Sequence, residues 1–128
     1  MKITSEIFFA GLSGANVKEI YVADYDGANV RKLTRHQSLS IMPEVSSDGG
    51  SIAYLSYKDR YCFLYVFDRA SGGSHALSKE VGLNSAAGWV PGGQRLAMTL
   101  SKDGNAEIYL RDKNGGNSVR LTQNKEGD

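Results

Sequence analysis

The stretch EIYVADYDGANVRKLT at residues 19–34 decides the fold, because it recurs twice at a constant spacing of 44 residues. The second copy is FLYVFDRASGGSHALS at 63–78, and the third is EIYLRDKNGGNSVRLT at 107–122. Each copy has a tyrosine at its third position, an aspartate at its sixth, and leucine followed by threonine or serine at its end. Such spacing indicates a tandem structural repeat whose units pack on their neighbours.

The segment before each copy repeats as well. SDG at 47–49 maps onto PGG at 91–93, and IAY at 52–54 maps onto LAM at 96–98. In the other direction, Ile52-Ala53 maps onto Phe8-Phe9. The alignment therefore predicts three units with no insertion or deletion between them.

Each unit is predicted to form four short strands separated by turns rich in glycine, aspartate and asparagine. Four strands in about 40–45 residues is the period of a β-propeller blade. The first unit begins at its second strand, so we expect eleven strands. The predicted strands lie at 6–12, 30–34, 42–46, 51–57, 63–68, 86–90 and 118–123, with the others placed by the repeat.

The predicted fold is therefore all-β, with propeller-like blades of four-stranded antiparallel sheets. The chain holds about three blades of an incomplete ring, in units at approximately 1–35, 36–79 and 80–128. A closed propeller needs about 4–8 blades. We expect either a fragment of a longer propeller or self-association, in which a homodimer completes a six-bladed ring.

Composition excludes several classes of protein. The 128 residues carry a net charge of +1, which gives no electrostatic argument for nucleic acid or an anionic membrane. Apolar runs fall short of the ~20 residues of a membrane-spanning helix, so direct membrane insertion is not expected. The first 15 residues are interpreted as a strand rather than a signal peptide, because Glu6 interrupts their apolar core. The single cysteine, Cys62, excludes a disulfide framework and a cysteine-based zinc site.

The residues that could carry chemistry favour structural roles. Asp24 and Asp26 resemble the start of a calcium loop but lack its glutamate at the twelfth position, so an Asx turn is the preferred interpretation. A cation in the channel of an assembled ring is left open. His36 and His75 are interpreted as solvated loop histidines, and Cys62 as a small apolar group. No catalytic residue, metal site or cofactor is predicted.

Two sets of tyrosines and several glycines have predicted positions. The tyrosines at the repeat spacing (Tyr21, Tyr65 and Tyr109) are expected to pack between blades, and those in loops (Tyr25, Tyr57 and Tyr61) to reach the surface. The pairs at 72–73, 92–93 and 115–116 are interpreted as turn glycines rather than phosphate loops, because no Gly-Lys-Ser/Thr follows them.

The copy at 19–34, followed by PEVSSDGGSIAYLSYKD at 43–59, resembles the family of TolB-like propeller repeats. That family's pattern runs roughly P-x-W-S-P-D-G-x-x-I-A-F-x-S and then x-I-Y-V-x-D-x-D-G-x-x-x-R-x-L-T. The order of the stretches resembles the first half of the propeller of the Tol–Pal system in the cell envelope of Gram-negative bacteria. Val45 and Ser47 depart from the pattern's Trp and Pro, whereas Trp89 and Pro91 keep them.

The resemblance implies a non-enzymatic, periplasmic scaffold that binds the peptidoglycan-associated lipoprotein Pal and, as further partners, other Tol proteins. It also implies that the partner binds the loops leading into the innermost strands. By position, the partner-binding residues are Leu39, Ser40, Ile41, Met42, Leu83, Asn84, Ser85 and Ala86.

The alternative function is a substrate-gating propeller of a prolyl-oligopeptidase-like or tricorn-like peptidase. Such a peptidase carries a Gly-x-Ser-x-Gly elbow in a separate domain, and these 128 residues contain no such motif. A propeller lyase is a weaker third possibility, because it needs histidine and arginine facing the channel.

Overall fold

The computed structural model describes residues 5–80, 82, 84–102 and 104–122. These residues form strands, turns and loops, and none of them forms a helix that could cross a membrane. The strands are β1 (Glu6–Gly14), β2 (Val17–Asp24), β3 (Arg31–Lys32), β4 (Ser40–Val45), β5 (Ser51–Ser56), β6 (Phe63–Asp68), β7 (Gly73–Ser78), β8 (Asn84–Trp89), β9 (Arg95–Leu100), β10 (Glu107–Asp112) and β11 (Val119–Arg120).

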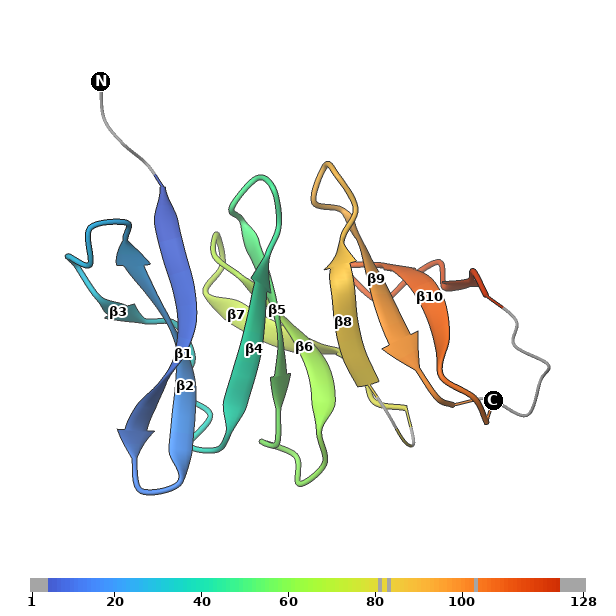
Figure 1. Ribbon diagram of the computed structural model, residues 1–128, viewed down its shortest axis with the longest axis horizontal. Coiled ribbons are helices and arrows are strands. Elements are labelled where there is room, and N and C mark those ends of the chain that lie inside the picture. Colours follow the sequence, from blue (N-terminus) through green and yellow to red (C-terminus); the bar gives the residue numbers. More distant parts are fainter. Residues whose placement is uncertain (1–4, 81, 83, 103, 123–128) are drawn as a thin grey trace.

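The strands form three antiparallel sheets that follow the chain order. The first sheet has the order β1-β2-β3, the second β4-β5-β6-β7, and the third β8-β9-β10-β11. The sheets stand side by side along the long axis of the molecule (Figure 1). Within the described residues this confirms the predicted all-β architecture of three blades, the first of which lacks its innermost strand. The terminal fourth strands β3 and β11 are shorter than predicted.

The turns form as their sequences predict. The Gly27 amide donates to the Asp24 carbonyl at 2.8 Å, and the Gly115 amide donates to the Asp112 carbonyl at 2.8 Å. Both glycines have positive φ, at 88° and 97°, where a side chain would be strained. These two turns lie 88 residues apart, at twice the repeat spacing, so the first and third sheets reverse direction at the same place. In the second sheet the turn is one residue longer, and the Gly72 amide donates to the Asp68 carbonyl at 2.8 Å.

The prediction that the first unit aligns without an insertion is wrong. In the second sheet Tyr65 pairs with Tyr54, so the repeat spacing would place Ala10 opposite Tyr21. Instead Phe9 lies opposite Tyr21. Strand β1 is therefore displaced by one residue relative to its counterparts.

A β-bulge causes this displacement. The register of β1 against β2 shifts between Leu12 and Gly14, where β1 uses one more residue than its partner. The pair Ile7-Phe8 consequently occupies the place predicted for Phe8-Phe9. Because side chains alternate between the two faces of a strand, a shift of one residue exchanges the faces on which the residues of β1 lie.

Two hydrophobic clusters fill the spaces between the sheets. The first lies between the first and second sheets and contains Ile20, Ile52, Tyr54, Tyr65 and Phe67. The second lies between the second and third sheets and contains Ala53, Leu55, Leu64, Val66, Leu77, Leu96, Met98, Leu100 and Tyr109. The predicted packing between blades is thus confirmed for Tyr65 and Tyr109. Tyr21 instead stacks on Phe9 of its own sheet, with ring centroids 5.6 Å apart.

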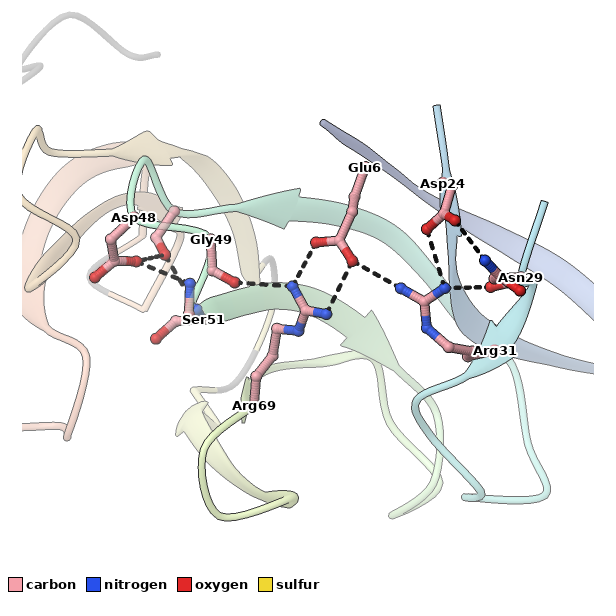
Figure 2. A network of polar contacts seen from close by, with 10 residues as sticks. Glu6, Asp24, Asn29, Arg31, Asp48, Gly49, Ser51 and Arg69 are labelled. Carbon is pink, nitrogen blue, oxygen red and sulfur yellow. Dashed lines mark hydrogen bonds and ion pairs between the residues drawn. The ribbon is translucent and has the colours of Figure 1, made fainter. Parts of the chain in front are cut away.

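A polar network links the first two sheets at one edge. Figure 2 shows the Glu6 carboxylate between two arginines. Arg69 donates to it at 2.7 and 3.1 Å, and Arg31 donates to it at 2.7 Å. Arg69 also donates to the Gly49 carbonyl at 3.3 Å. The hydrogen bonds from Arg69 hold the pKa of Glu6 below its ordinary value, although partial burial acts against them.

Candidate partner-binding site

The described residues among those predicted to bind a partner lie at one edge of the sheets and in the strands β4 and β8 that begin there. Successive antiparallel strands reverse direction, so the segments before β4 and β8 share an edge with the loops that follow β5 and β9. We call this the entry edge and define it by the described residues of 33–39, 57–62, 79–82 and 101–106. It is the lower edge in Figure 1. The opposite turn edge contains 25–30, 46–50, 69–72, 90–94 and 113–118.

The first predicted segment holds two residues at the edge itself. Leu39 is 37% exposed, and its carbonyl accepts a hydrogen bond from the Tyr57 amide at 2.9 Å. Ser40 is fully buried, and its hydroxyl lies 2.9 Å from that of Ser56. Leu39 is therefore available to a partner, whereas Ser40 fastens the start of β4 to β5.

The next two residues lie within β4. Ile41 is half-buried and packs against the second hydrophobic cluster. Met42 is 65% exposed and has a φ of 55°, which is unusual for a residue with a side chain. The register of β4 shifts between Ile41 and Glu44, so Met42 lies in a β-bulge. Bulges re-aim side chains, and this one presents a large apolar group to solvent.

In the second predicted segment, Leu83 lies outside the described residues. Asn84 is buried, and its side-chain oxygen accepts hydrogen bonds from the Ser78 hydroxyl and, at 3.1 Å, from the Glu80 amide. Its side-chain nitrogen donates to the carbonyls of Glu80 at 2.8 Å and Gly82 at 3.2 Å. Asn84 thus organises the loop that leads into β8.

The structure brings three of the eight predicted residues together around one hollow. Met42, Ser85 and Ala86 line a cavity of about 220 Å³ with Glu44 and Leu55. The hollow lies between β4 and β8, which are the first strands of adjacent sheets. The two predicted segments therefore form a continuous surface across the boundary between the second and third sheets.

A buried glutamate that the sequence analysis missed supports the first segment. Glu19 is 1% exposed, and its carboxylate accepts hydrogen bonds from the Thr34 hydroxyl at 2.6 Å and from the amides of His36 and Gln37 at 3.2 and 2.8 Å. The pair recurs in the third sheet, where Thr122 donates to Glu107 at 2.5 Å. The sequence did contain a signal for this buried pair, because a glutamate and a threonine recur at twice the repeat spacing, 88 residues further on.

The prediction that His36 is a solvated loop residue is wrong. Its ring is half-buried and stacks on Tyr54 at 5.8 Å, and its Nε2 lies 2.7 Å from the Tyr54 hydroxyl. Burial lowers the pKa of His36, and burial raises the pKa of Tyr54 to about 12. The ring thereby fixes the loop before β4 to the second sheet.

The other candidate residues have structural partners. Asp26 forms the predicted Asx turn by accepting from the Ala28 amide at 2.9 Å. Asp24 accepts from Asn29 at 2.6 Å and from Arg31 at 3.3 Å. Cys62 packs against the second hydrophobic cluster, as predicted. His75 lies on the strand β7 rather than in a loop; it is exposed, and its Nε2 lies 2.7 Å from the carbonyl oxygen of Lys113.

Comparison with known proteins identifies the family. The family model described as the TolB beta propeller domain matches residues 4–128. The chain belongs to the TolB β-propeller domain family. It is 41% identical over 111 residues to the Tol-Pal system protein TolB of Desulfosudis oleivorans and 38% identical over 120 residues to the TolB homolog of Chlorobaculum tepidum. These matches cover 87% and 94% of the chain but only 25% and 27% of the relatives, so the chain spans about a quarter of their length.

Solved TolB propellers have the same fold. The structure of TolB from Acinetobacter baumannii superposes with a TM-score of 0.78 at 26% identity, over 91% of this chain and 30% of that one. Dipeptidyl peptidase 4 of Porphyromonas gingivalis gives a TM-score of 0.67 at 24% identity, over 93% of this chain and 17% of that one. The peptidase likeness shows the fold alone.

Within this TolB repeat, the tryptophan of the family pattern has a structural role. The Trp89 Nε1 donates to the Glu44 carbonyl at 2.8 Å and joins the third sheet to the second. Val45 occupies the same repeat position one blade earlier and is 39% exposed. The departure from the TolB pattern at Val45 therefore replaces a hydrogen-bond donor with an exposed apolar side chain.

Proposed function

We propose that this chain is part of a non-enzymatic, periplasmic TolB propeller within the Tol–Pal system. It binds a Pal-like lipoprotein at its entry edge and at the adjoining parts of β4 and β8. Membership of the TolB β-propeller domain family supports the class of protein. The observation that carries the proposed site is the hollow between β4 and β8, which unites residues from both predicted segments. The name of the Desulfosudis relative supports the assignment to the Tol–Pal system.

The exposed and buried residues of the site have different proposed roles. Leu39 and Met42 offer exposed apolar surface, and the centres of protein interfaces are rich in apolar groups, methionine among them. Ser85 and Ala86 line the adjoining hollow, where a partner's side chain fits. Ser40, Ile41 and Asn84 are buried or half-buried and position these residues without contacting the partner through their side chains. Leu83 completes the proposed segment.

The test is a calorimetric titration of this chain with the soluble domain of the Pal lipoprotein from the same organism, which gives the Kd. Met42→Ala removes the most exposed apolar side chain of the site while keeping the left-handed backbone equally strained. We expect Kd to rise about tenfold, which is the effect of losing a central interface side chain. The matched control is Val30→Ala, because Val30 is 56% exposed on the turn edge.

The two variants separate the outcomes. Loss of affinity in Met42→Ala with an unchanged Kd in Val30→Ala supports the site. Equal affinities for both variants and the unmodified chain contradict the site, and an unmodified chain that does not bind Pal contradicts the function. Thermal unfolding of each variant shows whether the fold is kept.

The peptidase-gating alternative has weaker support. Dipeptidyl peptidase 4 is only 24% identical to this chain, and this similarity supports the shared fold alone. Similarity to TolB relatives reaches 41% identity over most of the chain. We therefore propose protein binding without catalysis.

A further inference from the structure

We propose that the entry edge docks an acidic protein surface through a row of basic side chains that repeats with the blades. The inference rests on the proposed function and names the chemistry of the partner's surface. A net charge of +1 conceals this feature, because opposite charges lie at opposite edges of the sheets.

Two pairs of exposed cations recur at the repeat spacing. Arg35 and Lys79 are 44 residues apart and begin the loops that lead into β4 and β8. Lys58 and Lys102 are also 44 residues apart and begin the loops that follow β5 and β9. Adjacent blades thus place the same charges at the same points of the entry edge. Lys18 and Arg60 add two further exposed cations beside them.

Aromatic rings fix the positions of these lysines. The Lys58 ammonium lies 5.3 Å from the ring centroid of Tyr65, and the Lys102 ammonium lies 5.3 Å from that of Tyr109. Tyr65 and Tyr109 are themselves buried and 44 residues apart. A cation over an aromatic ring is held in place at a modest gain in free energy. The row of positive charge is therefore ordered before a partner arrives.

The acidic groups among the described residues of the entry loops are engaged internally. Asp59 accepts from the Tyr65 hydroxyl at 2.5 Å and lies 3.6 Å from the ammonium groups of Lys58 and Lys79. The Tyr65 hydrogen bond contributes most to lowering the pKa of Asp59. Glu80 pairs with Arg111 at 3.3 Å. The described residues at and beside this edge thus include six exposed cations, of which Lys58 and Lys79 are paired with Asp59. At the adjoining strand ends, the carboxylates of Glu19 and Glu107 are buried.

The turn edge has the opposite character. Its turns and the strand ends beside them carry five aspartates, namely Asp24, Asp26, Asp48, Asp68 and Asp112. Two of its cations, Arg31 and Arg69, are bound by Glu6 (Figure 2). The turn edge also holds the cations Arg95 and Lys113, but its aspartates are more numerous. A macromolecule with a negative surface is therefore attracted more strongly to the entry edge than to the turn edge.

Exposed apolar groups in the entry loops and in β4 favour a protein over a nucleic acid or a lipid headgroup. Met42 and Tyr61 are 65% and 68% exposed, and Tyr57 and Leu39 are 41% and 37% exposed. An apolar, aromatic centre with a charged rim is the anatomy of a protein–protein interface. Leu39 and Met42 are aliphatic, so they offer neither a stacking surface for a base nor a partner for a phosphate. The occupant is therefore an acidic protein face with an apolar centre.

The test reverses charge on each edge in turn. The variant Arg35→Glu/Lys102→Glu changes the entry edge, and the matched variant Arg95→Glu/Lys113→Glu changes the turn edge by the same net charge. Association of each with the soluble Pal domain is followed by stopped-flow fluorescence at several NaCl concentrations. We expect the entry-edge variant to associate about tenfold more slowly at low salt, with a shallower salt dependence, because steering charges act mainly on the association rate. The turn-edge variant should match the unmodified chain.

Each other result overturns the inference in a recognisable way. Binding of Pal with unchanged association rate and salt dependence in the entry-edge variant refutes the basic docking edge and leaves the proposed function standing. Absence of Pal binding by the unmodified chain refutes both. Phosphatidylglycerol vesicles and a single-stranded DNA oligonucleotide serve as competing probes. If either binds more tightly than Pal and loses affinity in the entry-edge variant, the occupant is not a protein.

Discussion

The Glu6 carboxylate accepts hydrogen bonds from both terminal nitrogens of Arg69, and so joins β1 to the turn that follows β6 in the next sheet. The Arg69 guanidinium also lies 5.4 Å from the ring centroid of Phe8. The Glu6 and Arg69 side chains are only 23% and 29% exposed. A bidentate and partly buried pair of this kind contributes more to the stability of the fold than an isolated surface ion pair does.

We expect Glu6→Gln to lower the free energy of unfolding by about 1 kcal/mol, because a neutral amide replaces the charged partner of two arginines. The measurement is urea unfolding at pH 7. Glu44→Gln is the matched control, since Glu44 is exposed and its removal changes the net charge equally. The control should shift stability by less than about 0.5 kcal/mol. Equal losses in the two variants would show that the pairing with Arg69 has no stabilising effect.

Stability should depend on pH through His36. Burial lowers its pKa below the ordinary 6.5, while Glu19 and Asp59 raise it and Lys58 lowers it by charge. The unfolded chain therefore binds a proton in a range of pH where the folded chain does not. The free energy of unfolding must rise with pH from the folded pKa up to about 6.5 and then level off. Thermal unfolding between pH 4.5 and 8 should show this rise, which His36→Gln removes.

An NMR titration of the His36 ring protons gives the independent check. An apparent pKa at or above the ordinary 6.5 would contradict the buried stack on Tyr54. The Glu6 carboxylate acts in a lower range: its lowered pKa gives stability that is present above 4.5 and is lost as the pH falls through the folded value. The two effects are separable, because Glu6→Gln leaves the His36 range unchanged.

Two glycines of similar backbone conformation should respond differently to alanine. Gly93 has φ 74° and Gly27 has φ 88°, so both substitutions strain the backbone by about 1 kcal/mol. A Cβ at Gly93 would lie 3.0 Å from the Asp48 carboxylate of the adjacent blade, whereas one at Gly27 meets nothing within 4 Å. Ser46 and Gly50 hold that carboxylate in place. Gly93→Ala should therefore lower Tm further than Gly27→Ala, and equal shifts would contradict a close approach of the two blades.

The oligomeric state is predicted from the outer faces of the terminal sheets. Ile7 and Val119 are 48% and 50% exposed there, and Leu121 is 55% exposed. We expect this chain to form a homodimer of twice its 13.9 kDa mass, in which two sets of three blades complete a six-bladed ring. Light scattering on a sizing column over a range of concentrations measures the mass. A monomer at every concentration would rule out completion of the ring by self-association.

The repeat in the sequence was sufficient to predict the blades. The 44-residue spacing located the hairpin turns of the second and third sheets but not the turn between β1 and β2, and strand β6 has the predicted bounds. Turn chemistry identified Gly27 and Gly115 correctly, since few residues other than glycine adopt their backbone angles. What remained hidden depends on contacts between units. The stacking of His36 on Tyr54 fixes the loop between the first two sheets to β5, and no local pattern of polarity indicates it.

The site was predicted only as a pair of segments. The sequence could not separate Met42, which a bulge turns outward, from Ser40, which is buried two residues earlier. A strand that alternates regularly would place both on one face. The net charge did not reveal the basic residues of the entry edge, because the acidic residues of the turn edge offset them in the sum. Only the topology shows that Lys58 and Lys102 lie on the same edge as Arg35 and Lys79.

The bulge between Leu12 and Gly14 makes the first blade non-interchangeable with the others. In a chimaera whose blades are joined at multiples of 44 residues, the second unit could replace the third and keep its strand register. The same exchange into the first position would be one residue out of phase. The 44-residue spacing matches Glu6 to Gly50, whereas the strand pairing matches Glu6 to Ser51. Propeller chimaeras built from this chain therefore need a junction after Ser13, or an offset of 45 residues for a junction within β1.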